Sequence, residues 1–270
     1  MILNRYNTFN LILLVLSSLV LLFILAPLAG LFFKTGAAEF FETASDKEVQ
    51  NSIWLTLWVS FGATFLFAIG GIPLAWLMAR KEFPMKNIVQ GIIDIPVVLP
   101  HTAAGIAILG FISRDGVLGK VAGTVGLTLV NNPMGIALAM AFVSIPFLVN
   151  SARDGFAAVP ERLEKAALSL GASRTRVFFT ISLPLAWRSI MTGFVMMFAR
   201  GMSEFGAVVI VAYHPMIAPV LIYERFSSYG LNYARPASVL FVLVALAVFI
   251  ILRLISFRKK EIPLTADAEA

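Results

Sequence analysis

Long apolar stretches constrain this sequence more than any other feature, because about 20 consecutive apolar residues are needed to cross the hydrocarbon core of a bilayer. About six such stretches occur in the 270 residues, near 11–33, 52–79, 88–112, 133–152, 190–212 and 237–256. Apolar residues make up 59% of the chain and charged residues only 13%. The sequence therefore predicts an all-α integral membrane protein, surrounded by lipid, in which about six transmembrane helices form one domain over residues 1–270.

The composition also limits the chemistry of the chain. There is no cysteine, so disulfides and cysteine-based metal sites are impossible, and the two histidines, His101 and His214, lie far apart in the sequence. We therefore expect no metal centre and no catalytic residues. Membrane topology explains the net charge of +6 better than a nucleic-acid partner does, so none is expected.

The basic residues assign an orientation. If both termini lie in the cytoplasm, fourteen lysines and arginines flank the spans on the inner side and six on the outer side, as the positive-inside rule requires. The sequence thus predicts a multi-pass protein of the cell membrane with a cytoplasmic loop over 153–189 and a disordered tail over 261–270. On the outer side we expect an acidic linker over 34–51, a Gly-rich loop over 113–132 and a rigid aromatic loop over 213–236.

The 153–189 loop should contain a short helix. Pro160 suits its first position, Glu161 suits the positive helix start, and Gly171 suits the residue just past its end. A helix of about 11 residues is about 16 Å long, too short to cross a bilayer. Four residues at helical spacing form a narrow apolar face: Leu163, Ala166, Ala167 and Leu170. By periodicity alone, an amphipathic connector resting on the membrane surface explains this pattern equally well.

A second helix is expected immediately after the first. Gly171 tolerates a positive φ and so permits a sharp turn, and Ser173 can cap the helix that follows. This second helix would carry Arg174, Arg176, Val177 and Phe178.

These segments resemble the cytoplasmic loop of bacterial and archaeal ABC importer permeases, whose motif is Glu-Ala-Ala-x-x-x-Gly, then nine intervening residues, then Ile-x-Leu-Pro. The matching residues are Ala166, Ala167, Gly171, Ile181, Leu183 and Pro184. The chain departs from the motif at its first position, where Lys165 replaces the glutamate and Glu164 precedes it. The resemblance implies a helix that docks on an ATPase and assigns this coupling role to Glu161, Leu163, Glu164, Lys165, Ala166, Ala167, Leu170, Gly171 and Ala172.

The resemblance also implies partners: a second copy of the chain in a homodimer, two ABC ATPase subunits and an extracytoplasmic oxyanion-binding protein. The chain has no Gly-x4-Gly-Lys-Ser/Thr loop, because Gly119-Lys120 lacks the earlier glycine. We therefore expect a non-catalytic permease subunit with no cofactor of its own, while ATP and Mg²⁺ are bound by the partner ATPase.

The fifth stretch carries two charges inside the membrane, Arg200 and Glu204, which would each be costly alone. They are four residues apart and can pair on one helix face. Ala199, Ser203 and Ala207 form a small-residue stripe with the same spacing. Two interpretations remain open: the pair only neutralises itself, or Arg200 attracts an anion in transit.

The third stretch contains Pro96 and Pro100, which remove backbone donors and should kink the helix. The kink either forms a gate beside the fifth span or serves packing alone. The candidate pathway residues are therefore Pro96, Pro100, Arg200, Ser203 and Glu204. We expect His101 to be a hydrogen-bonding core residue and Asp94 to be an anchor of the helix or loop.

The segment Asp94–Pro100 and the fifth stretch resemble the molybdate, tungstate and sulfate branch of these permeases. The outer segments 212–220 and 223–226 look most similar to archaeal tungstate/molybdate permeases. The resemblance implies import of molybdate or tungstate, with sulfate or thiosulfate as the alternative. A different class, an ion-coupled secondary transporter with Asp94, Glu204 or His101 as proton carriers, would leave the short cytoplasmic helices without a role.

Overall fold

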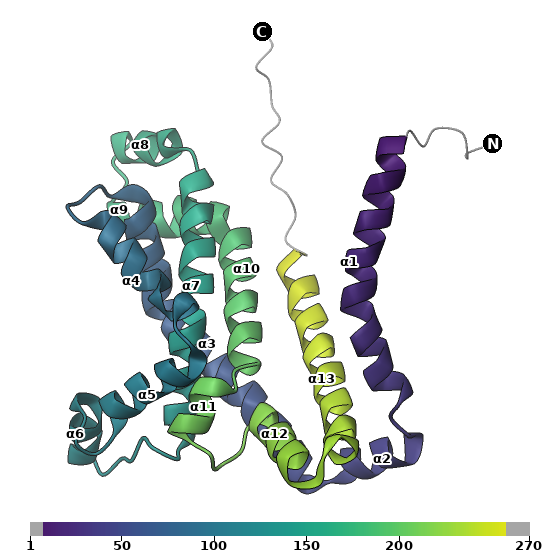
Figure 1. The fold of residues 1–270 in the computed structure, drawn as a ribbon. Coiled ribbons are helices and arrows are strands. Elements are labelled where there is room, and N and C mark those ends of the chain that lie inside the picture. The colour runs from purple at the N-terminus through teal and green to yellow at the C-terminus, as the bar shows by residue number, and fades with distance from the viewer. Residues whose placement is uncertain (1–7, 258–270) are drawn as a thin grey trace. The chain divides into compact units, whose positions relative to one another are not determined.

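A computed structural model of the chain describes residues 8–257, in which all regular secondary structure is helical (Figure 1). The predicted disordered tail over 261–270 lies outside the described residues, as do four of the basic residues used for the orientation: Arg5, Arg258, Lys259 and Lys260. The helices are α1 (Thr8–Phe33), α2 (Ala37–Ser45), α3 (Lys47–Arg80), α4 (Lys86–Val98), α5 (His101–Ile112), α6 (Val117–Thr124), α7 (Pro133–Ala158), α8 (Glu161–Ser169), α9 (Arg174–Val177), the π-helical segment η1 (Phe178–Ser182), α10 (Leu183–Met202), α11 (Gly206–Val211), α12 (Ala218–Tyr229) and α13 (Leu231–Phe257).

The predicted all-α membrane fold is confirmed. Five helices in the described chain are long and apolar enough to cross a membrane, and the bent pair α4 and α5 adds a sixth span if it is counted as one. The chain divides into two compact units, one formed by residues 8–50 and 222–243 and the other by 51–221 and 244–257.

The larger unit is built around α7, which packs along α10 and also contacts α4, α5 and α11. Two glycines permit the close approach of α7 and α10. A Cβ atom at Gly155 would lie 2.4 Å from Cβ of Ser189, and one at Gly193 would lie 2.8 Å from Cβ of Ser151. Small residues of this kind drive helix association where lipid removes the hydrophobic advantage of packing. Ser151 Oγ also donates to the Ser189 carbonyl at 2.7 Å.

A buried polar stripe runs along α3. Its members recur every four residues: Ser52, Thr56, Ser60 and Thr64. The hydroxyls of the last three donate to the carbonyl four residues earlier, at 2.6–2.7 Å, which satisfies them without another helix. Thr56 Oγ1 also accepts from the backbone N–H of Ala218 at 2.8 Å.

The third span is broken more sharply than a proline kink predicts. The chain bends by 112° between α4 and α5, across Leu99 and Pro100. Pro96 lies inside α4, whereas Pro100 is the N-cap of α5. Of the two prolines, only Pro100 stands at the break itself. Its fixed φ and missing N–H suit a helix start better than a helix interior.

The expected continuous fifth span over 190–212 is wrong. Helix α10 ends at Met202, and α11 begins only at Gly206. The small-residue stripe of Ala199, Ser203 and Ala207 therefore does not lie on one helix face. At its other end the span is longer than expected, since α9, η1 and α10 run on as one helical span over Arg174–Met202.

The connecting segments are more ordered than their composition indicates. The 34–51 linker contains α2, the Gly-rich 113–132 segment contains α6, and the 213–236 segment contains α12. The predicted 153–189 loop is shorter, because α7 continues to Ala158 and α9 begins at Arg174.

The smaller unit is held by Arg225, which is only 6% exposed although its segment was expected to be a surface loop. Its guanidinium donates to Asp46, lies 3.7 Å from Glu48 and sits 5.2 Å from the centre of the Tyr233 ring. Partial burial acts to raise the pKa of Asp46, but the hydrogen bond and charge of Arg225 and the backbone N–H groups of Glu48 and Val49 together hold that pKa below its usual value.

Candidate functional site

Helix α8 has the ends that its sequence predicts, within a residue or two. Pro160 is the N-cap and Glu161 the first helical residue, so the helix has 9 residues and is about 13 Å long. After Leu170, Gly171 adopts φ +87°. The N–H of Ala172 then bonds the carbonyl of Ala167, and that of Gly171 bonds Leu168. This is the Schellman arrangement, which satisfies the last carbonyls of a helix and needs a left-handed residue.

The second helix is also capped as predicted, because Ser173 Oγ accepts from the backbone N–H of Arg176 at 3.3 Å. It is not a separate short helix, however, since α9 continues through η1 into α10. Pro184 lies in the first turn of α10, directly after the π-helical segment η1, so the residue that cannot donate an N–H stands where the helical hydrogen-bond pattern changes. The Ile181-Ser182-Leu183-Pro184 motif therefore spans the junction between η1 and α10.

The face that α8 turns inward differs from the apolar face predicted for it. The inward residues are Leu163, Glu164 and Ala167, whereas Ala166 is exposed and Leu170 is 89% exposed. The predicted apolar face is therefore divided: Leu163 and Ala167 lie on the same side as the buried Glu164, and its other two residues are exposed. Lys165 and Gly171 are exposed and Ala172 is half-buried.

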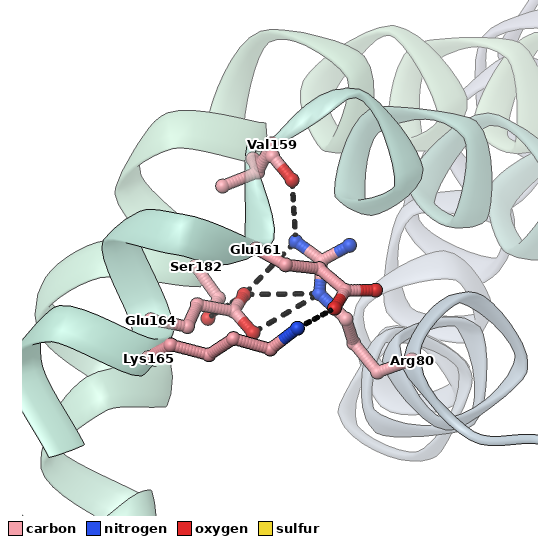
Figure 2. Close-up of polar contacts among 6 residues, drawn as sticks. All are labelled: Arg80, Val159, Glu161, Glu164, Lys165 and Ser182. Carbon is pink, nitrogen blue, oxygen red and sulfur yellow. Dashed lines mark hydrogen bonds and ion pairs between the residues drawn. The ribbon is translucent and has the colours of Figure 1, made fainter. Parts of the chain in front are cut away.

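Glu164 is the centre of a buried ionic clamp, defined here as Arg80, Val159, Glu164 and Ser182 (Figure 2). Arg80 Nε lies 3.0 and 3.1 Å from the two carboxylate oxygens, and its Nη2 lies 2.9 Å from Oε1. Ser182 Oγ donates to Oε1 at 2.7 Å, and Arg80 Nη2 also donates to the Val159 carbonyl at 2.8 Å. Buried charges persist when they are paired and hydrogen-bonded in this way. The clamp fixes α8 to the end of α3 and to η1.

The exposed edge of α8 carries a second, weaker ion pair. Lys165 Nζ lies 2.8 Å from Glu161 Oε2, and both side chains are more than half exposed. The hydrogen bond from Lys165, and then its charge, lowers the pKa of Glu161, so the carboxylate stays ionised at neutral pH. Lys165, which departs from the motif, thus has its charge neutralised by Glu161, while the neighbouring Glu164 provides the anchoring carboxylate.

Arg200 and Glu204 form a second charged cluster, which also includes His101. Arg200 Nη1 lies 2.9 Å from Glu204 Oε2, as the spacing predicts, although Glu204 stands beyond the end of α10. Glu204 is 1% exposed, and its Oε1 accepts from the backbone N–H of Ala207, in the first turn of α11. The carboxylate therefore joins the two halves of the broken fifth span.

His101 brings the two broken spans together. It is the first residue of α5. Its Nε2 and Nδ1 lie 2.8 and 3.0 Å from Arg200 Nη2, and its Nδ1 lies 3.2 Å from Glu204 Oε2. A Cβ at Gly206 would lie 2.7 Å from His101 Cβ, so α11 approaches α5 closely there. The expectation that His101 is a core residue is wrong, because its side chain is 47% exposed. Ser203 is also exposed, and its hydroxyl bonds the carbonyl of Arg200.

Asp94 acts as an anchor between α4 and α7. Its carboxylate accepts from Asn150 Nδ2 at 2.7 Å and from Gln90 Nε2 at 2.8 Å. Gln90 Nε2 also donates to Asn150 Oδ1 at 2.8 Å, which closes a polar triangle. The partner Asn150 was not found in the sequence, because it lies 56 residues away and shares no local pattern with Asp94. No cluster of residues able to hold a metal ion occurs within 8–257.

The fold and these sites define a class, a multi-pass membrane protein with a short helix clamped beside its spans. Residues 71–260 match the family described as the inner membrane component of binding-protein-dependent transport systems. The match covers more than half of the chain, and the chain belongs to this family.

Relatives and solved structures agree with that assignment. A molybdate/tungstate transport system permease protein of Thermococcus kodakarensis is 40% identical over 246 residues, covering 90% of this chain and 94% of the relative. That of Pyrococcus furiosus is 47% identical over 211 residues, covering 78% and 80%. A probable sulfate transport system permease protein of Chlorokybus atmophyticus is 32% identical, covering 79% and 75%. A bacterial ABC transporter for alginate import has the same fold, with a TM-score of 0.72 at 19% identity, covering 93% of this chain and 96% of that one.

Proposed function

We propose that this chain is the membrane-spanning subunit of an ATP-driven importer for molybdate and tungstate. The observation that carries the proposal is the clamped helix α8, whose inward face is fixed by Arg80 and Ser182 while Leu168 and Leu170 stay exposed. Exposed apolar side chains on a rigidly held polar helix suit a protein partner. The anion is taken from the relatives of 40% identity or more that are named for molybdate and tungstate.

In this proposal both termini and α8 lie on the cytoplasmic side, as the basic residues indicate. Two copies of the chain form a homodimer, and each α8 docks on one of two ABC ATPase subunits, which bind ATP and Mg²⁺. An extracytoplasmic binding protein delivers the anion. The chain itself carries out no hydrolysis. It converts a movement of α8, imposed by the ATPase, into opening of the pathway.

The proposed pathway passes the cluster of His101, Arg200, Ser203 and Glu204. Arg200 is a quarter exposed, whereas Glu204 is buried behind it, so a positive group faces the accessible side of the cluster. One cation, partly neutralised by Glu204, can attract an oxyanion without holding it tightly. The breaks at Leu99–Pro100 and at Ser203–Phe205 flank this cluster and supply the gate, in which Pro96 bends the preceding helix.

Sulfate or thiosulfate is the second candidate, because sulfate permeases are among the relatives at 32% identity. Uptake into proteoliposomes that contain the chain, its ATPase and its binding protein tests both, with tungstate, molybdate and sulfate compared. We expect ATP-dependent uptake of tungstate or molybdate, and sulfate at equal concentration should compete poorly. Sulfate uptake alone would correct the anion, and gradient-driven uptake without ATP would refute the proposed class.

A further inference from the structure

A cavity of about 180 Å³ lies beside α8, separate from the cluster around Arg200. Its walls include Trp76 and Lys81 near the end of α3, Leu168 on α8, and Arg174 and Val177 on α9. The clamp residues Arg80 and Glu164 form another part of the wall. The volume is many times that needed by one water molecule, so the cavity has room for a small polyatomic ligand.

The charges that line this cavity do not balance. Arg80 is paired with Glu164, and Lys165 is paired with Glu161. Lys81 and Arg174 also line the cavity, yet neither side chain has an ion pair or hydrogen bond with any residue in 8–257. Two unpaired cations that face one small cavity create a positive potential, which attracts an anion.

The remaining wall groups fit the same kind of ligand. Trp76 lines the cavity, so an aromatic side chain stands beside the two cations. A guanidinium and an ammonium offer several donors, and their geometry suits a tetrahedral oxyanion better than a single carboxylate.

We propose that this cavity binds a tetrahedral oxyanion, either free phosphate or the phosphate of a phospholipid, between Lys81 and Arg174. Bound there, the anion bridges the end of α3 and the start of α9 and braces α8 between them. The site lies outside the proposed pathway, and phosphate binding to it can be measured on the chain alone, without an ATPase.

Trp76 provides a direct readout of binding. The full chain, purified in detergent and stripped of lipid, is titrated with sodium phosphate at constant ionic strength while tryptophan fluorescence is recorded. We expect a saturable change that disappears in Trp76→Phe, since the other tryptophans, Trp54, Trp58 and Trp187, do not line the cavity. Chloride replaces phosphate in the blank titration.

The variant Lys81→Gln/Arg174→Gln should bind phosphate at least about tenfold more weakly, because each charge-assisted hydrogen bond contributes about a factor of ten. Arg176→Gln is the matched control: it removes a charge two residues away that does not line the cavity. Thermal unfolding of each variant checks that it is folded, and Lys81→Arg, which keeps the charge, should still bind.

Reconstitution separates the two sources of phosphate. If a phospholipid is the ligand, transfer to phosphatidylglycerol vesicles produces the Trp76 change and added phosphate then adds nothing. If free phosphate is the ligand, the titration is unchanged in those vesicles. Absence of any saturable change with phosphate or vesicles would overturn the proposal, as would equal affinities in the double variant and in Arg176→Gln.

Discussion

Replacing Glu164 by Gln tests the ionic clamp most directly. The change keeps the shape of the side chain but removes the charge that Arg80 faces. Arg80, whose side chain is 7% exposed, would keep the Val159 carbonyl and at best a neutral amide oxygen as partners. Breaking a buried ion pair from one side costs about 3–5 kcal/mol, and the slight exposure of Glu164 places the expected cost near 3 kcal/mol. That cost raises the population of molecules with α8 detached by about 150-fold.

Hydrogen exchange of the purified chain measures this population. Amides of α8 should exchange about a hundredfold faster in Glu164→Gln, whereas amides at the centre of α7 should not change, because opening is local. Glu161→Gln is the matched control, since it removes an exposed carboxylate from the same helix and should leave exchange nearly unchanged. The double variant Arg80→Met/Glu164→Met should recover much of the protection, because it leaves no buried charge unpaired. Unchanged exchange in Glu164→Gln would refute the assignment of the clamp as the anchor of α8.

Three further perturbations have defined outcomes. Gly171→Val should loosen the α8–α9 turn and reduce co-purification of the ATPase, because a β-branched residue is strained by about 1–2 kcal/mol or more at φ +87°, whereas Gly171→Asn should be tolerated. Arg200→Ala should destabilise the chain in thermal unfolding because Glu204 is buried, and adding Glu204→Gln should restore stability without restoring uptake if Arg200 attracts the anion. Arg225 lowers the pKa of Asp46 in the folded chain. The stability that this ionised carboxylate contributes is therefore complete above its unfolded pKa of 3.8 and is lost as pH falls through the lower folded pKa. Thermal unfolding of the wild-type chain should show lower stability below about pH 4.

Each of these experiments has a contrary outcome. Equal ATPase binding by the valine and asparagine variants would show that the positive φ at residue 171 is not needed for docking. Recovery of full uptake in the double variant would limit Arg200 to a structural role. The loss of stability at low pH should be smaller in Asp46→Asn than in Asp115→Asn, because Glu161, whose pKa is also lowered, still contributes to it. The same curve in both variants would assign the pH dependence to other groups.

Local signals in the sequence predicted local structure well. Gly171 has the positive φ that a helix ending there requires, and Ser173 caps the helix that follows, because both effects act within a few residues. The apolar stretches likewise predicted the membrane fold, since hydropathy and length suffice for that purpose. The break after Met202 was missed because hydropathy averages across Ser203–Phe205 and does not detect a buried carboxylate that joins two helices.

Contacts between distant residues could not be predicted in the same way. Glu164 was assigned to a contact surface, and it faces inward only because Arg80, 84 residues earlier, ends α3 at the same place. His101 was expected to be a hydrogen-bonding core residue. Its actual partners, Arg200 and Glu204, reach it only through the two chain breaks.

The continuity of α9, η1 and α10 has a mechanical consequence. This helical span leaves the α8 turn at Arg174 and ends at Met202, so a single rod of 29 residues, on the order of 40 Å, joins the clamped helix to Arg200. If such a rod pivots by about 5° at its Arg174 end, its other end moves by about 3 to 4 Å, roughly the distance between two non-bonded atoms in contact. Since Glu204 ties that far end to α11 and to His101, the sweep would act directly on the place where both broken spans meet.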